Sequence, residues 1–262
     1  DNPAQAVPEQ MYQIERALDF VSAITTTAEF LANKLGYPAK THVIPNCLDP
    51  AMWSVMDHEK QESFRIMWSG SPTHERDLQL LDPLFDWALA ETGVQLVFIG
   101  AMPTRFGRKD KLERGVMMVN PAYSGKVICL PWTATARYPA TIAAWAPSVA
   151  VCPLRDNDFN LSRSNFKAVE SWAMGLPVIA SRVGPYAATD DDLMCYADSA
   201  DAWIAAAKML RDATTRQHLG ALGRKRVEET YDIRKVVPQW ENALTGNVPL
   251  PVASEFRTGS GV

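Results

Sequence analysis

Residues 153–181 carry polar and charged side chains whose types and spacing suit the binding of a phosphate group. The apolar and polar pattern predicts a strand, a polar loop, a helix over 164–174 and a second strand. The amino end of such a helix offers free backbone N–H groups and the positive end of the helix dipole, which together bind phosphate. Ser162 and Ser164 stand at that end and add two hydroxyl donors.

Two charged residues follow on the same predicted helix. Lys167 and Glu170 are three positions apart, so they share one helix face. A cation there suits a diphosphate, and a carboxylate suits the two vicinal hydroxyls of a ribose, which are paired donors. The alternative is a solvated ion pair, and surface pairs of this kind are common and weak.

A second segment, residues 67–78, predicts a strand running into Gly70, then a short turn and a helix. Glycine lets the backbone come close to a ligand. Polar residues follow in the turn: Ser71, His74 and Arg76. The alternative is an ordinary strand-to-helix turn with Thr73 as its N-cap.

A third loop holds Pro131 and Trp132 directly after a predicted strand. Trp132 could stack on a nucleotide base, although a tryptophan more often packs within the protein. Two acidic clusters, Asp156–Asp158 and Asp190–Asp192, invite a metal-binding alternative in which carboxylates hold a divalent ion against a diphosphate. We favour solvated loops for both clusters and expect no metal requirement.

The elements that position these loops alternate along the chain. Strands are predicted at 64–69, 94–100, 126–130, 148–152, 177–181 and 193–196. Helices are predicted at 77–92, 136–145, 164–174, 201–211 and 214–230. This alternation predicts an α/β fold with a doubly wound parallel sheet covered by helices on both faces. In such sheets ligands bind at the carboxyl ends of the strands, where all three loops lie.

The flanks differ from this middle part. A helix is predicted at 8–18. Within the middle part, residues 103–125 are polar and irregular, which predicts a long loop or an excursion from the sheet. We divide the chain at 1–48, 49–235 and 236–262, the last being a C-terminal helix and tail.

The composition excludes several classes of protein. Hydrophobic residues make up 47% and charged residues 21%, as in ordinary globular proteins, and the net charge of −4 argues against a basic surface for duplex binding. The four cysteines form no C-x-x-C pair, which argues against a zinc site and favours a reducing, cytoplasmic setting. No apolar run is long enough to span a membrane.

The stretch ESWAMGLPVIAS, residues 170–181, resembles E-A-M-A-x-G-x-P-V-x-A-S, which ends the E-x7-E signature of retaining GT-B glycosyltransferases of family four, or group 1. Glu170 matches the second, ribose-binding glutamate of that signature. The first glutamate, which contacts the donor sugar in the family, is replaced here by Ser162. Residues 153–170 resemble a variant form, P-L-x-D-x-x-F-N-x-x-K-S-x-x-K-x-x-E, with Arg163 in place of its first lysine.

The resemblance covers roughly residues 10–240. Residues 67–78 resemble the family's first phosphate loop, which implies that Arg76 approaches a phosphate and that His74 bonds either a phosphate or the sugar. Residues 130–133 resemble its base-binding loop. Residues 19–46 resemble the stretch that closes the family's N-terminal domain. The resemblance therefore implies the Rossmann-like, C-terminal donor-binding half of a GT-B enzyme, preceded by the last elements of an acceptor-binding domain that this chain lacks.

The resemblance implies a hexosyltransferase that moves a sugar from a nucleotide diphosphate sugar, such as a UDP-sugar, to an acceptor. Arg76 and Lys167 are the expected catalytic cations, and we expect both to contact one diphosphate, because both loops open at the carboxyl ends of their strands. The expected donor-binding residues are Gly70, Ser71, His74, Pro131, Trp132, Asn160, Ser162, Ser164 and Glu170. The base, the sugar and the acceptor (a glycan, a lipid-linked sugar, a protein or modified DNA) stay open.

Two alternatives remain beside that prediction. One is a non-catalytic nucleotide-sugar-binding module or subunit that needs a partner for turnover. The other is a phage-type enzyme that glycosylates hydroxymethylated DNA bases, with the basic residues of 105–111 contacting phosphates.

Overall fold

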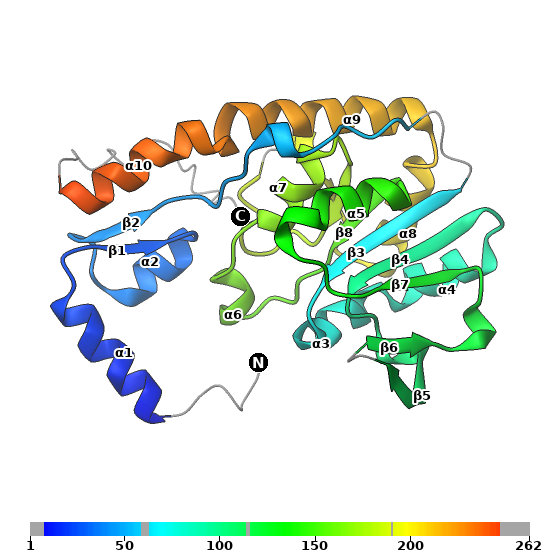
Figure 1. The fold of residues 1–262 in the computed structure, drawn as a ribbon, viewed down its shortest axis with the longest axis horizontal. Coiled ribbons are helices and arrows are strands. Elements are labelled where there is room, and N and C mark those ends of the chain that lie inside the picture. The colour runs from blue at the N-terminus through cyan, green and yellow to red at the C-terminus, as the bar shows by residue number, and fades with distance from the viewer. Residues whose placement is uncertain (1–7, 59–62, 114–115, 190, 247–262) are drawn as a thin grey trace, which may run out of the picture.

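A six-stranded, fully parallel sheet forms the centre of the protein, in a computed structural model that describes residues 8–58, 63–113, 116–189 and 191–246 (Figure 1). Its strands are β3 (Phe64–Gly70), β4 (Val94–Gly100), β7 (Val127–Leu130), β8 (Val149–Cys152), β9 (Val178–Ala180) and β10 (Cys195–Tyr196). They lie in the order β10-β9-β8-β3-β4-β7, and every neighbouring pair is parallel. The predicted doubly wound α/β fold is thereby confirmed.

The order of the strands creates one reversal point. From β3 the chain adds β4 and β7 on one side, and it then returns to add β8, β9 and β10 on the other. The connections after β3 and β8 therefore leave the sheet in opposite directions. In open α/β sheets this switch point is where a crevice forms and ligands bind.

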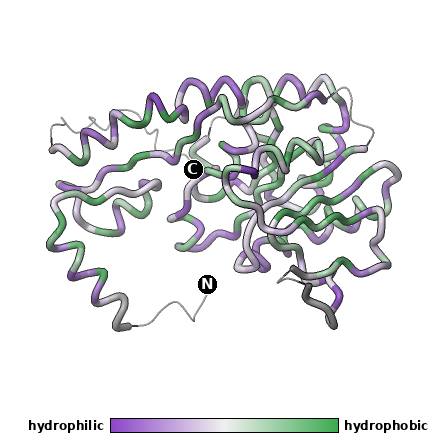
Figure 2. Tube along the Cα trace, viewed as in Figure 1, coloured by the Kyte–Doolittle hydropathy of each residue, from purple (hydrophilic) through white to green (hydrophobic). Residues whose placement is uncertain are grey.

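Helices cover both faces of the sheet because side chains alternate along each strand. In β3, Met67 packs into the cluster formed with α5 (Tyr138–Trp145) and α7 (Phe166–Ala173). Its neighbours Ile66 and Trp68 pack into the opposite cluster with α4 (Asp82–Ala90) and α8 (Ala200–Met209). Figure 2 shows hydrophobic residues gathered along the central strands, whereas hydrophobic and hydrophilic residues alternate along the long C-terminal helices.

Two predicted segments differ in the structure. The helix expected over 77–92 is divided into α3 (Glu75–Leu78), a 3-10 turn (Gln79–Leu81) and α4, because Pro83 in the first turn of α4 has no N–H to continue the helix. The prediction of an irregular loop over 103–125 is wrong for part of that segment. It contains an antiparallel hairpin of β5 (Gly107–Glu113) and β6 (Val116–Val119), since the apolar run at 116–119 pairs with the polar strand before it.

The first elements form a small unit beside the main sheet. They are α1 (Pro8–Phe20), β1 (Ile24–Thr26), α2 (Glu29–Leu35) and β2 (Thr41–Val43), and β1 and β2 pair in parallel without joining the six-stranded sheet. Helix α10 (Ile233–Thr245) returns to this unit, where Val236 and Ala243 pack on Ile44 (Figure 1). The predicted boundary at residue 236 thus falls inside α10.

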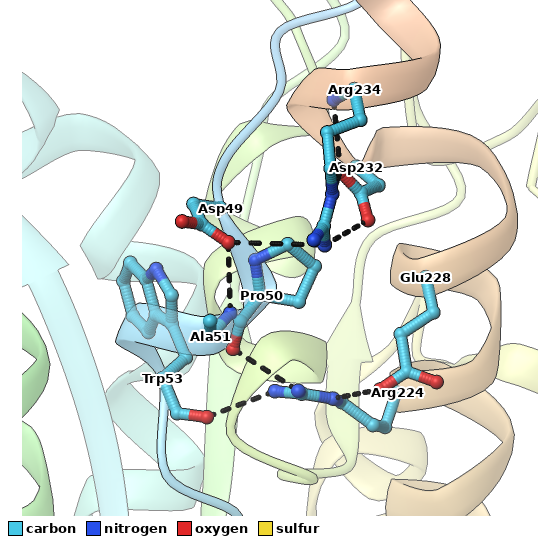
Figure 3. Close-up of polar contacts among 8 residues, drawn as sticks. All are labelled: Asp49, Pro50, Ala51, Trp53, Arg224, Glu228, Asp232 and Arg234. Atoms are coloured by element: carbon cyan, nitrogen blue, oxygen red, sulfur yellow. Dashed lines mark hydrogen bonds and ion pairs between the residues drawn. The ribbon is translucent and has the colours of Figure 1, made fainter.

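The linker after β2, residues 44–58, is bonded to the C-terminal helices (Figure 3). Arg224, in the last turn of α9 (Ala213–Arg226), donates to the carbonyl oxygens of Trp53 at 2.9 Å and Pro50 at 3.1 Å. The guanidinium of Arg234 lies 3.9 Å from Asp49 and also bonds Asp232. These bonds fix the linker where the chain passes between the small unit and the main sheet. Within the described residues, no helix combines the length and the apolar character needed to cross a membrane.

Candidate functional site

The turn after β3 and helix α7 meet at the switch point of the sheet. A Cβ atom built on Gly70 would lie 2.7 Å from the Trp68 ring and 2.8 Å from Lys167 Nζ. The ammonium of Lys167 also stands over the Trp68 ring, 4.6 Å from its centroid. Any side chain at position 70 would therefore displace Lys167, which explains the glycine there. The structure thus brings together two residues that the sequence places in separate motifs.

Lys167 and Glu170 are half-buried charges, not a solvated ion pair. Their charged groups do not approach within 4.0 Å of each other, and no described carboxylate lies within that distance of Lys167 Nζ. Burial lowers the pKa of Lys167 to about 8. Burial raises the pKa of Glu170 to about 7, and the charge of Lys167 opposes that rise. Two charges held in a poorly solvated place without close partners are typical of a functional site.

The amino end of the helix differs from the prediction. Residues Asp158–Leu161 form a single turn, α6, and α7 begins only at Phe166. The backbone N–H of Ser162 donates to carbonyls of that turn, and its hydroxyl donates to the carbonyl of Asp158 at 2.7 Å. The free N–H groups expected from Ser162 onward are therefore partly used, because Ser162 closes α6 instead of opening α7.

Ser164 and Asn165 bond residues that come from outside the main motif. Ser164 Oγ lies 2.9 Å from Asn46 Nδ2, which donates to it from the linker. The side-chain amide of Asn165 donates to the hydroxyl of Tyr231 at 2.7 Å. These two bonds tie the start of α7 to the linker and to the end of the π-helical turn Val227–Tyr231. Roles of Ser162 and Ser164 in donor binding stay predictions.

The turn after β3 directs Asp77 into the protein and leaves Arg76 exposed. Asp77 accepts hydrogen bonds from His74 Nδ1 at 3.0 Å, from the backbone N–H of Arg155 at 3.0 Å and from Asn160 Nδ2 at 2.9 Å. The amide of Asn160 also donates to the carbonyl of Arg155 at 2.8 Å. His74 and Asn160, both predicted to bind the donor, therefore take part in one buried network.

Arg76 and Ser71 remain open to a ligand. Arg76 lies on the exposed side of α3, and Ser71 is half-buried, with its hydroxyl 2.6 Å from that of Thr73. The predicted pairing of Arg76 with Lys167 on one diphosphate stays a prediction.

Trp132 lies beside the carboxyl end of β4. A Cβ on Gly100 would lie 2.7 Å from the Trp132 ring and 2.6 Å from the carbonyl oxygen of Gly70, and Gly100 has a φ of 93°. The tryptophan side is open, since Trp132 is 72% exposed, and Pro131 beside it is exposed too. A large aromatic face next to the switch point is available for stacking on a base.

Two residues near the site were missed by the sequence interpretation. Asp77 stands in a charged run, Glu75-Arg76-Asp77, that gives no sign of which side chain turns inward. Tyr138, from the start of α5, hydrogen-bonds Ser69, and burial raises the pKa of its hydroxyl well above the usual range, with the nearby charge of Glu170 adding to the rise. The sequence carries no signal for Tyr138, because its place depends on the packing of α5 against the sheet.

The two acidic clusters were the alternative candidates for a metal site. Asp156 and Asp158 are exposed, and Asp158 forms an ion pair with Lys34 of α2. In the second cluster, Asp190 and the side chain of Asp191 lie outside the described residues. Among the residues described, no group of three or more histidine, cysteine, aspartate or glutamate side chains is placed to hold a metal ion.

A doubly wound parallel sheet, with a glycine turn against a half-buried lysine at its switch point, defines a Rossmann-like domain. Residues 64–212 match the family described as glycosyl transferases group 1. That match covers more than half of the chain, so the chain belongs to this family.

Solved structures share the fold at low sequence identity. Sucrose-phosphate synthase from Thermosynechococcus elongatus has 18% identity and a TM-score of 0.66, over 94% of this chain and 63% of that chain. Alr3699/HepE from Anabaena, in complex with UDP-glucose, has 15% identity and a TM-score of 0.66, over 92% of this chain and 70% of that chain. This chain therefore spans less than two thirds of the synthase. A comparison with curated proteins gives no significant match.

Proposed function

We propose that this chain binds the nucleotide diphosphate sugar of a retaining glycosyltransferase of family four, with the diphosphate between the Gly70 turn and Lys167. The observation that carries the proposal is Lys167 itself. Its ammonium lies in a half-buried position at the switch point, on the ring of Trp68 and against a glycine that leaves space. A protein that only needed a stable core would gain nothing from this arrangement, because a buried cation without a close anion is costly. An anionic ligand removes that cost.

The other residues fit the remaining parts of a nucleotide. Glu170 lies one helix turn beyond Lys167, so its carboxylate can accept from both ribose hydroxyls once it is ionised. Trp132 offers its open face to the base. Arg76 supplies a second cation to the diphosphate from the exposed side of the turn. In transfer of the sugar, the diphosphate leaves with negative charge, and Lys167 and Arg76 stabilise that charge electrostatically.

The proposal includes no metal ion and names no acceptor. Support for a donor-binding role comes from HepE, a structural neighbour whose complex holds UDP-glucose. One basic residue of the DNA-glycosylating alternative, Arg105, is paired with Asp82 at 2.8 Å and also with Asp86, so its guanidinium is already engaged within the protein. A non-catalytic donor-binding module remains the second candidate, favoured by Ser162 at the position of the family's first glutamate.

A thermal-shift panel tests this function. Sugar nucleotides of uridine, guanosine and adenosine are added to the chain with a chelator present, and a ligand that binds only the folded state must raise the melting temperature. We expect one base to give a clear rise, and Lys167→Met to give a much smaller rise at the same ligand concentration. No rise with any nucleotide, or a rise that needs manganese, would contradict the proposal. A turnover assay on the chain with and without its flanking sequence separates the enzyme from the binding module.

A further inference from the structure

Asp77 is the centre of a buried network that joins the turn after β3 to the loop after β8. One carboxylate oxygen faces His74 Nδ1, and the other accepts from the backbone N–H of Arg155 and from the amide of Asn160. Burial alone would raise the pKa of Asp77, but the hydrogen bonds from these three residues outweigh it and hold the pKa below its usual value. The carboxylate is therefore ionised, and it can only accept hydrogen bonds.

This network fixes the protonation of His74. Since Asp77 accepts only, His74 Nδ1 must carry a proton. Burial lowers the pKa of His74 despite the bond to Asp77, and the charges of Lys167 and Arg163 lower it further, so the ring is neutral near pH 7. A neutral imidazole with its proton on Nδ1 has a lone pair on Nε2. Among the described residues, no protein donor is bonded to that Nε2.

The place of His74 decides what that lone pair can recognise. The imidazole meets the edge of the Trp68 ring, with centroids 5.9 Å apart, and Lys167 stands over the same ring. His74 therefore lies beside the position proposed for the diphosphate. A phosphate oxygen needs a donor, which Lys167 supplies and a lone pair does not. A sugar hydroxyl is a donor, and it can bond to Nε2 directly.

We propose that His74 Nε2 accepts a hydrogen bond from a hydroxyl of the donor's sugar, with Asp77 as the positioning residue that fixes the required tautomer. This inference rests on the proposed function and deepens it. The residue types alone leave phosphate and sugar open for His74, and the network selects the sugar. Ser162, in contrast, uses its hydroxyl to close α6.

Two substitutions at position 74 distinguish the roles of the two ring nitrogens of His74. His74→Asn keeps a side-chain donor for Asp77 but has no group at the place of Nε2, whereas His74→Gln places an amide group near that position. Each is titrated with a sugar nucleotide and with the matching free nucleoside diphosphate, for the base that the wild-type chain binds. We expect His74→Asn to reduce the affinity for the sugar nucleotide roughly five- to tenfold, while the affinity for the free diphosphate stays the same within about twofold. His74→Gln should lose less.

Nitrogen NMR of the unliganded protein tests the tautomer separately. We expect the proton on Nδ1 in the wild-type chain. In Asp77→Asn the amide oxygen must face the two donors from Arg155 and Asn160, so its NH₂ group faces His74 and moves the ring proton to Nε2. A proton on Nε2 in the wild-type chain would overturn the inference.

The binding results distinguish the two levels of the argument. If His74→Asn loses the same affinity for the sugar nucleotide and for the free diphosphate, His74 contacts the phosphate. If it loses affinity for neither, the network is purely structural. Either result overturns the inference while the proposed function stands. If the wild-type chain binds no nucleotide at all, the proposed function fails and this inference fails with it.

Discussion

Replacing Glu170 by glutamine should make the unliganded protein more stable while it weakens nucleotide binding. The rise in the pKa of Glu170 from 4.5 to about 7 corresponds to about 3 kcal/mol of cost for keeping its carboxylate ionised in the folded state. Glutamine keeps the size of the side chain and removes this cost. Part of the gain is lost because Lys167 then has one less anion nearby, so we expect a net gain of about 1–2 kcal/mol at pH 8.

The dependence on pH gives the prediction its sign. A carboxyl whose pKa is raised in the folded state makes its full contribution to stability when the pH lies below its pKa in the unfolded chain. This contribution is lost as the pH rises through its pKa in the folded protein. The advantage of Glu170→Gln should therefore be small at pH 4.5 and complete at pH 8. Urea denaturation at both values measures it. Glu241→Gln, on the exposed side of α10, serves as the matched control and should change stability little at either pH.

The reasoning is refuted if Glu170→Gln is no more stable than the wild-type protein at pH 8, or if its gain is the same at pH 4.5. Titration calorimetry completes the test. Nucleoside affinity should fall in the variant, because an amide offers the ribose one acceptor and a misplaced donor. Pyrophosphate affinity should change much less.

The remaining predictions concern the phosphate, the base and the turn. Lys167→Met should weaken a nucleoside diphosphate by about tenfold or more, as expected for a charge-assisted bond, while calorimetry shows the nucleoside little affected. The losses of diphosphate-binding free energy in Arg76→Ala and Lys167→Ala should be non-additive when the two substitutions are combined. Additive losses would show that the two cations do not contact the same diphosphate. Trp132→Ala should reduce nucleoside binding by about 1–3 kcal/mol without lowering the melting temperature, since its ring is mostly exposed. Gly100→Ala should destabilise the fold by at least about 1–3 kcal/mol in urea denaturation, because of its positive φ and the contact with the Gly70 carbonyl.

The parts of the fold that the sequence predicts well are those governed by continuous apolar runs. The run from Phe64 and the run from Val94 can satisfy their burial only as central strands, and both occur where the pattern predicts them. The pairing of the Gly70 turn with the helix of Lys167 also follows, because the carboxyl ends of parallel strands share one edge of the sheet. Such predictions depend on hydrophobic periodicity and topology, which a sequence displays.

The parts that it predicts poorly depend on tertiary choices among similar residues. Glu75, Arg76 and Asp77 are all charged, and only the three donors gathered around Asp77 decide that it turns inward. The break between α6 and α7 was missed for a related reason, since Asn157 caps a single turn through its side chain and Ser162 then closes it. Local polar residues of this kind bond the backbone in several ways, and the neighbouring loops select one.

A crystal structure of the chain with the sugar nucleotide that gives the largest thermal shift tests the central claim most directly. We predict a diphosphate within hydrogen-bonding distance of Lys167 Nζ, beside the Gly70 turn, with the ribose hydroxyls on Glu170 and without a metal ion. A nucleotide bound at another edge of the sheet, or a diphosphate that reaches the protein only through a metal held by Asp156 and Asp158, would contradict the account.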